Sequence, residues 1–156
     1  MIKWTRMLFV GVLLAAVSCA AVATASARSS VAHEAGVATV KLAKTERGRI
    51  LVSSTGFTLY EFTKDSGGKD NCVEITGCAH VWPPLLVTGT PTAGTGVKRS
   101  LLSTITLPDG TRQVTYAGHP LYTYIGDGGP GETGYVGAQE FGGFWYALKK
   151  RAQAVK

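Results

Sequence analysis

Motifs of the common enzyme classes are missing from this chain of 156 residues. It has no nucleophile elbow, metalloprotease helix, phosphate-binding loop or dinucleotide fingerprint. Gly94 and Gly96 form a Gly-x-Gly, but they lie in a polar segment that does not open a helix. The absence of catalytic motifs favours a protein that is not an enzyme and that carries no cofactor.

Histidine is scarce, with only three residues, His33, His80 and His119. Metal ligands usually cluster in sequence or come in threes, so no metal site is expected. The alternative hypothesis is a redox-associated periplasmic protein. In it His80 and His119 meet across two repeats and hold copper, zinc or haem with Asp65 or Asp127. A third hypothesis is a hydrolase that uses Asp65 and Asp127 as paired carboxylates.

An amphipathic helix pattern is absent between Gly48 and Leu148. Short β-branched and aromatic segments, separated by turn residues, predict strands instead. We expect strands at 37–42, 49–53, 57–62, 101–107, 112–116, 119–125 and 141–148. The segment at 78–85 is expected to be an edge strand or an extended cover segment, since its two consecutive prolines cannot donate backbone hydrogen bonds. The predicted fold class is all-β, with about eight short strands packed as one sandwich or barrel-like domain.

Long hydrophobic runs are absent except near the N-terminus. The run at 7–17 follows Lys3 and Arg6 and precedes the small-x-small sequence at 25–27. This order predicts a signal peptide at 1–27, because the run is only marginally long enough to span a membrane. Cys19 follows Ala-Val-Ser, which resembles a degenerate lipobox. Cys19 is therefore either a lipidation site or part of a discarded signal peptide.

Basic residues are outnumbered in the centre of the chain. Residues 48–148 contain six Lys and Arg against eight Asp and Glu, although the whole chain carries a net charge of +6. The basic residues concentrate at 41–49 and in a basic tail at 149–156. From Lys149 onward this tail is expected to be solvated and either frayed or a short helix. A nucleic-acid-binding domain is expected to carry a basic face on its folded part. Nucleic acid is therefore not an expected partner, and membrane contact is expected only through the signal peptide or a lipid anchor.

Two cysteines, Cys72 and Cys78, remain after the predicted signal peptide. A close pair in an exported chain indicates a disulfide, which would staple the loop at 73–77 and contribute roughly 2 kcal/mol. Their C-x5-C spacing differs from the C-x-x-C of thioredoxin-like proteins and from zinc knuckles. A redox pair and a pair of metal thiolates are the competing interpretations.

A motif of Leu-Tyr-x-aromatic-x-x-Asp occurs twice in the chain, 62 residues apart. The motif residues are Leu59, Tyr60, Phe62 and Asp65 in the first copy and Leu121, Tyr122, Tyr124 and Asp127 in the second. A tryptophan follows each copy, Trp82 and then Trp145. This order indicates an internal duplication. We expect one domain at 48–148 with repeats at 48–87 and 107–148, joined by 88–106 and preceded by a leader and first strand at 28–47.

The motif is predicted to be structural rather than catalytic. Period-two alternation places Tyr60 and Phe62 on one strand face and Leu59 on the other, so this strand should be buried on both sides. Asp65 and Asp127 precede glycines and should accept backbone hydrogen bonds in Asx turns. A cation-binding role for the two carboxylates is the alternative. The two tryptophans are expected in the core.

These features together resemble the bacterial family called secreted repeat of unknown function, also described as predicted lipoproteins. Both motif copies fit its Yx(F/W/Y)xxD pattern. Further similarities are the two cysteines with the Trp-Pro-Pro-Leu segment at 82–85, the Gly-x-Pro-Leu-Tyr segment at 118–122 and the final Trp-Tyr at 145–146. The resemblance covers 51–148. It implies an exported, envelope-associated β-rich protein without an established activity.

The leading functional hypothesis is an exported β domain that binds an unknown ligand or envelope partner, or that supports a surface assembly. Its location would be secreted, periplasmic or at the cell envelope. Many of its aromatic residues should be core in so small a domain. An exposed aromatic patch would favour ligand or glycan binding, and complete burial would remove that argument.

Overall fold

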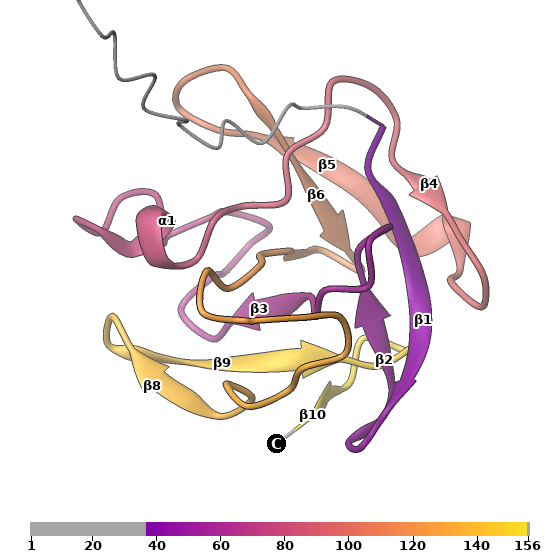
Figure 1. The fold of residues 1–156 in the computed structure, drawn as a ribbon. Helices are drawn as coiled ribbons and strands as arrows, with labels where there is room; N and C mark the ends of the chain where they lie inside the picture. The colour runs from indigo at the N-terminus through magenta and orange to yellow at the C-terminus, as the bar shows by residue number, and fades with distance from the viewer. Residues whose placement is uncertain (1–36, 156) are drawn as a thin grey trace, which may run out of the picture. The chain divides into compact units, whose positions relative to one another are not determined.

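The computed structural model describes residues 37–155. The predicted signal peptide at 1–27, Cys19 and the start of the leader lie outside the described residues. Within 37–155, no helix combines the length and apolar character needed to cross a membrane. The described chain contains ten short strands, one single-turn helix and one 3-10 turn (Figure 1).

The strands form three open sheets with the orders β2–β1–β4, β10–β9–β3 and β5–β6–β7, and β8 also pairs with β9. The strands are β1 (Thr39–Thr45), β2 (Gly48–Val52), β3 (Tyr60–Phe62), β4 (Thr92–Ala93), β5 (Leu102–Thr106), β6 (Arg112–Tyr116), β7 (His119–Pro120), β8 (Ala138–Glu140), β9 (Gly143–Leu148) and β10 (Ala154–Val155). The helix is α1 (Cys78–Val81), and the 3-10 turn is Arg99–Leu101. The prediction of an all-β fold with two repeat-like halves is confirmed.

The two motif strands pair with each other. Tyr60 N donates to Tyr122 O at 2.9 Å, and Tyr122 N donates to Tyr60 O at 3.0 Å. Tyr60 also pairs with Ala147 of β9, whereas Tyr122 pairs with Pro84. Ala147 and Pro84 each lie two residues after the tryptophan of their own repeat. Each tyrosine strand is therefore hydrogen-bonded to the tryptophan segment of the other repeat, and the two repeats are intertwined about a pseudo-twofold axis.

β3 separates two hydrophobic clusters, as its alternating pattern predicts. Tyr60 and Phe62 lie in an aromatic cluster together with both tryptophans and the disulfide. Leu59 lies in an aliphatic cluster on the opposite face. Leu59 and Tyr60 are fully buried, so the prediction that this strand is buried on both sides is confirmed.

The cysteines form the predicted disulfide, Cys72–Cys78, with a Cα–Cα distance of 5.3 Å. Both are fully buried against the aromatic cluster. The ring leads directly into α1, which begins at Cys78. This single turn of four residues is too short to be an amphipathic helix, so it agrees with the absence of such a pattern between Gly48 and Leu148.

The segment predicted at 78–85 as an edge strand or extended cover segment begins with α1, and its extended, proline-rich part does not lie at an edge. Pro83 O accepts a hydrogen bond from Thr123 N at 2.9 Å, and Leu85 N donates to Leu121 O at 2.8 Å. On the other side, Val87 N donates to Arg112 O at 2.8 Å. The prolines fit between two neighbours because the backbone groups that they contribute are acceptors. The predicted strand at 119–125 is regular only at β7, beyond which Tyr122 forms isolated bridges.

Both flanks of the repeats belong to the folded domain. β1 pairs with β2 along its length and in parallel with β4, which lies in the predicted linker. After a turn at Lys149–Ala152, β10 pairs with β9 and buries Val155, which is 7% exposed. The prediction of a frayed or helical end after Lys149 is therefore wrong. Because the flanks are folded, their basic residues lie on the surface of the domain.

Candidate functional site

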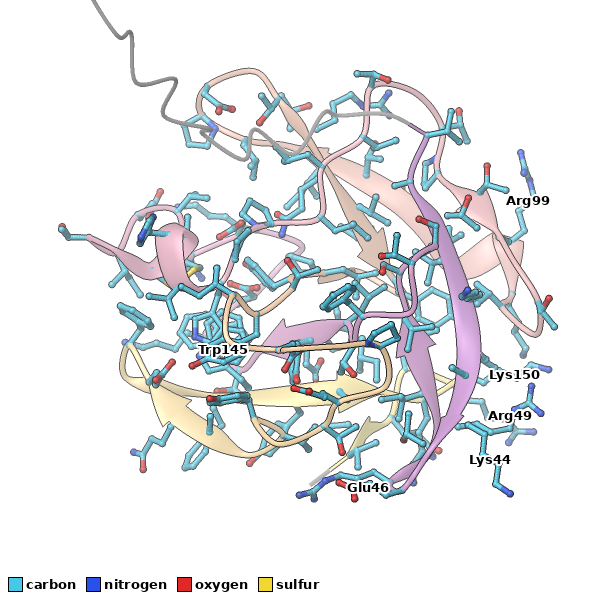
Figure 2. All side chains as sticks on the ribbon, in the orientation of Figure 1. Lys44, Glu46, Arg49, Arg99, Trp145 and Lys150 are labelled. Atoms are coloured by element: carbon cyan, nitrogen blue, oxygen red, sulfur yellow. A yellow bond between two sulfur atoms is a disulfide. The ribbon has the colours of Figure 1, made fainter. Side chains whose placement is uncertain are left out.

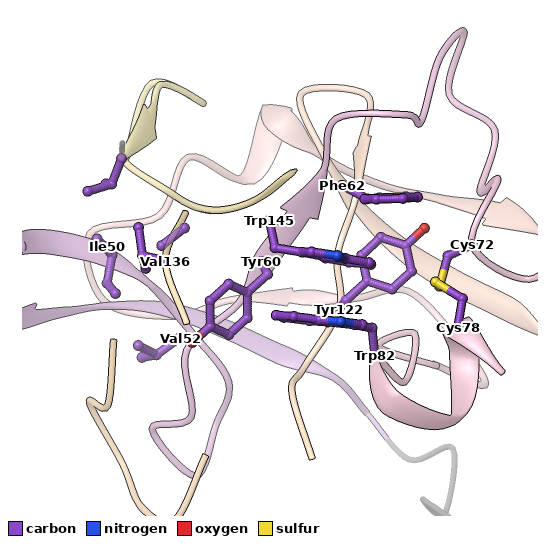
Figure 3. Packing of buried hydrophobic residues seen from close by; sticks show 12 residues of the cluster. Ile50, Val52, Tyr60, Phe62, Cys72, Cys78, Trp82, Tyr122, Val136 and Trp145 are labelled. Atoms are coloured by element: carbon purple, nitrogen blue, oxygen red, sulfur yellow. A yellow bond between two sulfur atoms is a disulfide. The ribbon is translucent and has the colours of Figure 1, made fainter. Parts of the chain in front are cut away.

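The two tryptophans form the centre of a column of stacked rings (Figure 3). The Trp82 and Trp145 rings are parallel, with centroids 4.0 Å apart and an interplanar angle of 2°. Phe62 stacks on Trp145 at 4.2 Å, and Tyr124 lies on Trp82 at 4.4 Å with a tilt of 38°. The order Phe62, Trp145, Trp82, Tyr124 alternates between the repeats. The second aromatic residue of each motif thus packs on the tryptophan of the other repeat.

The motif tyrosines contact the same column edge-on. Tyr60 meets Trp82 at 5.1 Å and 78°, and Tyr122 meets Trp145 at 5.1 Å and 89°. Edge-to-face contacts between aromatic rings are favourable because the positive ring edge meets the negative ring face. Both tyrosines and both tryptophans are fully buried. Tyr60, Tyr122 and both tryptophans therefore form core, whereas Tyr124 is only partly buried.

The motif carboxyls accept hydrogen bonds from the tyrosines of the opposite repeat. Tyr122 OH donates to Asp65 Oδ2 at 2.7 Å, whereas Tyr60 OH lies 3.2 Å from both Asp127 oxygens. The predicted Asx turns are wrong, because the turns close through the backbone, with Asp65 N donating to Phe62 O. Asp65 Oδ1 does accept a backbone amide, but from Asn71, six residues on. The carboxyls join the repeats rather than cap their own turns.

Burial raises the pKa of both motif carboxyls to about 6. Hydrogen bonds from the tyrosines and, for Asp65, from Asn71 N act in the opposite direction. The nearby acids differ, since Asp70 and Glu61 lie near Asp65 whereas Glu132 lies near Asp127. The two carboxyls thus occupy separate environments. This arrangement gives no support to the paired-carboxylate hypothesis.

His119, at the start of β7, forms an ion pair with Glu61 of β3. Nδ1 lies 2.6 Å from Glu61 Oε2, and the Glu61 side chain is 10% exposed. The hydrogen bond to Glu61 raises the His119 pKa, although partial burial opposes it. His80 is exposed on α1. Over residues 37–155, no three His, Cys, Asp or Glu side chains are placed to hold a metal ion, so the geometry gives the His80–His119 hypothesis no support.

A groove of about 420 Å³ opens beside Asp127. Its walls come from both repeats, with Phe57 and Pro83 from the first and Tyr124 and Ile125 from the second. Ser53, Thr55 and Thr123 add hydroxyl groups. Ile125 is 57% exposed, so the groove presents apolar surface to solvent next to one carboxyl. Unlike the buried tryptophans of the column, this groove is accessible from outside.

A family model described as a secreted repeat of unknown function matches residues 41–86 and, a second time, residues 103–149. The chain belongs to this family. The two matches each contain one motif copy and one tryptophan, in agreement with the duplication inferred from the sequence. No curated protein and no solved structure matches the chain.

Membership of the secreted-repeat family establishes an exported protein and indicates no catalytic family. Each matched repeat supplies half of every paired feature: one tryptophan of the stack, one tyrosine and one carboxyl of the crossed hydrogen bonds. The first match begins within β1, and the second ends just after β9, so the family unit includes strands that flank the two motifs.

The role of Glu61 was missed in the sequence analysis, although a signal for it was present. Glu61 occupies the variable position after Tyr60, and its alternation places it with Leu59 on a buried face. A buried carboxylate needs a partner of opposite charge or strong hydrogen bonds. His119, which precedes the second motif, was the best candidate in the sequence for the partner of Glu61. The groove residues had no such signal, because they come together only through the crossed pairing of the repeats.

The secreted-repeat domain is expected to be more stable in mildly acidic solution than at pH 8. The folded pKa of about 6 for Asp65 and Asp127 exceeds the unfolded value of about 4, so the folded state binds more protons between these values. Stability therefore falls as the pH rises from 4 through 6. The raised His119 pKa acts in the same direction, since its contribution is lost as the pH passes the folded pKa.

Thermal unfolding at pH 5 and pH 8 measures this effect. We expect a midpoint about 5 °C higher at pH 5, from about 1 kcal/mol per carboxyl after allowance for solvent screening. The variant D65N/D127N keeps oxygen acceptors for the tyrosines but cannot titrate, so it should lose most of the difference. A wild-type midpoint that is equal at both pH values, or higher at pH 8, contradicts the prediction.

Proposed function

We propose that this secreted-repeat protein is a non-enzymatic binding domain that holds a small ligand in the groove beside Asp127. The groove carries the proposal, since about 420 Å³ lies within the range of small-molecule sites. Such sites combine mainly apolar walls with a few polar groups that orient the ligand. Here Phe57, Tyr124 and Ile125 supply apolar surface, and Asp127 supplies the orienting acceptor.

The chemistry of the wall favours a ligand with an apolar or aromatic body and a hydrogen-bond donor or positive charge. Asp127 lies at the groove and receives one hydroxyl hydrogen, from Tyr60, so its oxygens retain acceptor capacity. Tyr124 is only partly buried and lines the groove. Its ring already packs on Trp82 at 4.4 Å and on Tyr135 at 3.8 Å, so Tyr124 contributes apolar wall surface rather than a free stacking face.

The other polar groups of the motifs support binding rather than catalysis. Tyr60, Tyr122 and Asp65 are engaged in hydrogen bonds that hold the repeats together. Asp127 is the single carboxyl among the groove residues. A general acid–base mechanism would need a further group within hydrogen-bond reach of a bound substrate. The groove therefore suits retention of a ligand.

Fluorescence titration with N-phenyl-1-naphthylamine, an uncharged aromatic probe with one N–H donor, tests this proposal. We expect saturable enhancement with one site per chain. Replacement I125D places a charge on the groove wall and should weaken binding at least tenfold. The matched control is F144D, because Phe144 is also an exposed apolar residue, at 40%, but lies outside the groove.

Competition distinguishes the role of Asp127 from simple apolar adsorption. Phenethylammonium should displace the probe better than phenylpropionate in the wild type, and D127N should lose that preference. No saturable signal, or equal weakening by I125D and F144D, would rule out the groove as the site. Equal displacement by both competitors in the wild type would refute the assigned ligand chemistry.

A further inference from the structure

Basic residues from three separate parts of the chain gather along one edge of the folded domain (Figure 2). We define the basic edge as Lys44, Arg49, Lys98, Arg99 and Lys150. All five side chains are exposed. Figure 2 labels four of them, Lys44, Arg49, Arg99 and Lys150, along the same side of the molecule. They come from the β1–β2 hairpin, the segment that leads into β5 and the turn between β9 and β10.

Specific contacts bring these three segments together. Lys44 and Arg49 are paired directly across the β1–β2 hairpin. The Tyr116 hydroxyl accepts from Lys98 N at 3.4 Å and donates to Lys150 O at 2.7 Å, which joins the other two segments. The Arg49 guanidinium lies beside Gly96, two residues before Lys98. The basic edge is therefore formed by segments that contact one another in the folded domain, and not by solvated tails.

Strand alternation explains why cations emerge at this place. Val40 and Leu42 lie in the aliphatic cluster, and period two places Lys44 on the same face of β1. On β2, Arg49 likewise follows the face of Leu51. The cluster ends before the hairpin turn, so this face continues into solvent with charged residues. Leu101, which follows Arg99 closely in sequence, packs at the rim of the same cluster.

Stability does not account for this arrangement. Like charges placed directly opposite each other on neighbouring strands are destabilising, and Lys44 faces Arg49. In the part of the chain that the structure describes, the ion pairs are Lys69–Glu74 and Glu61–His119, and neither involves the basic edge. The adjacent Glu46 accepts a hydrogen bond from Thr133 at 2.7 Å. The edge thus keeps an excess of positive charge that an external anion can neutralise.

The surface is open rather than hollow. The groove beside Asp127 and two other cavities, at Asp70 and at Glu132, contain none of the five basic-edge residues. The large apolar residues exposed on the described surface are Val37, Ile125, Tyr135 and Phe144, and none belongs to the edge. Single-stranded nucleic acids are usually held in grooves with stacking aromatic residues, which this edge lacks. An open surface with an excess of positive charge is complementary to a flat phosphate-bearing surface.

We propose that the basic edge docks the protein on a bilayer that contains anionic phospholipids. An exported protein encounters bilayer surfaces, and Lys and Arg side chains near anionic headgroups each raise membrane partitioning by about fivefold. Five such residues on one edge provide substantial electrostatic adhesion without insertion of any element. This inference is independent of the groove, which lies among different residues.

Co-sedimentation of the full chain with phospholipid vesicles tests the proposal. Vesicles of phosphatidylcholine with 30% phosphatidylglycerol are compared with pure phosphatidylcholine at 100 mM and 500 mM salt. We expect binding to the anionic vesicles that weakens with salt, because screening shortens the reach of surface charges. R49Q/K150Q should lower the partition coefficient about 25-fold, and K44Q/R99Q should do the same.

The control variant K64Q/K69Q removes two exposed basic residues away from the edge and has the same net charge as each test variant. Its partition coefficient for the anionic vesicles should fall by less than threefold. All variants retain the N-terminal apolar segment, so differences between them report on the folded surface. Equal binding to neutral vesicles, or equal losses in test and control variants, would falsify the proposal. Tighter binding to a 30-base-pair duplex DNA than to anionic vesicles at 100 mM salt would assign the edge to nucleic acid and overturn it as well.

Discussion

Replacing Trp145 with alanine is expected to lower the free energy of unfolding by about 3–5 kcal/mol. Trp145 is fully buried and contacts rings of both repeats, with Trp82 at 4.0 Å, Phe62 at 4.2 Å and Tyr122 at 5.1 Å. Alanine leaves a cavity in the middle of the column and removes all three contacts. Since small domains are stable by about 5–15 kcal/mol, the variant should lie near the limit of folding. Urea unfolding followed by far-UV circular dichroism measures the loss.

Phenylalanine variants separate ring stacking from indole hydrogen bonding. The Trp145 Nε1 group is buried and has no hydrogen-bond partner, whereas Trp82 Nε1 donates to Glu140 Oε2 at 2.7 Å. W145F should therefore lower the free energy of unfolding less than W82F does, because W145F also removes an unsatisfied buried donor. F144A changes an exposed ring next to Trp145 and should cost under 1 kcal/mol. A loss below 1 kcal/mol for W145A, or a larger loss for W145F than for W82F, contradicts this account of the column.

The stack and the crossed hydrogen bonds describe one architecture. Each repeat supplies a tyrosine strand that pairs with the tryptophan segment of the other repeat, through Tyr60 with Ala147 and Tyr122 with Pro84. A single repeat would leave its tryptophan without the opposite tryptophan ring and its carboxyl without the opposite tyrosine. Duplication thus creates a core that neither half forms alone. It also brings Phe57 beside Ile125, and so produces the groove.

Local pattern predicted the features that depend on neighbours in sequence. The alternation of Leu59, Tyr60 and Phe62 correctly predicted a strand buried on both sides. The spacing of Cys72 and Cys78 correctly predicted a disulfide. These predictions hold because strand periodicity and short loop closure act over a few residues.

Features that depend on long-range pairing could not be predicted from the local sequence pattern. Tyr60 and Asp127 are 67 positions apart, and no local rule indicates that a motif carboxyl serves the other motif rather than its own turn. The charge analysis failed for a related reason. It treated the residues from Lys149 as a solvated tail, whereas pairing of Val155 with Ala147 folds that segment onto the domain. This pairing places Lys150 on the folded surface, beside basic residues from the β1–β2 hairpin and the segment before β5.

The hydrogen bond between Tyr122 and Asp65 is expected to be energetically coupled across the repeats. The O–O distance of 2.7 Å is short, and Tyr122 is fully buried. Hydrogen bonds to charged groups contribute about 1.5–3 kcal/mol, so Y122F should lower the free energy of unfolding by that amount at pH 8. A double-mutant cycle of Y122F and D65A should give a coupling energy of about 1–2 kcal/mol, within the range for residues in contact.

The pseudo-symmetric pair offers an internal comparison for this coupling. Tyr60 OH lies 3.2 Å from each oxygen of Asp127, which is a longer and less directed contact. The cycle of Y60F with D127A should therefore give a smaller coupling than the cycle of Y122F with D65A. The crossed combination of Y60F with D65A joins residues that share no hydrogen bond and should be additive within about 0.5 kcal/mol. Additivity in the Tyr122–Asp65 cycle would contradict the role of these carboxyls as links between the repeats. Either single mutation already removes the shared hydrogen bond, so the double variant should lose less stability than the sum of the two single losses.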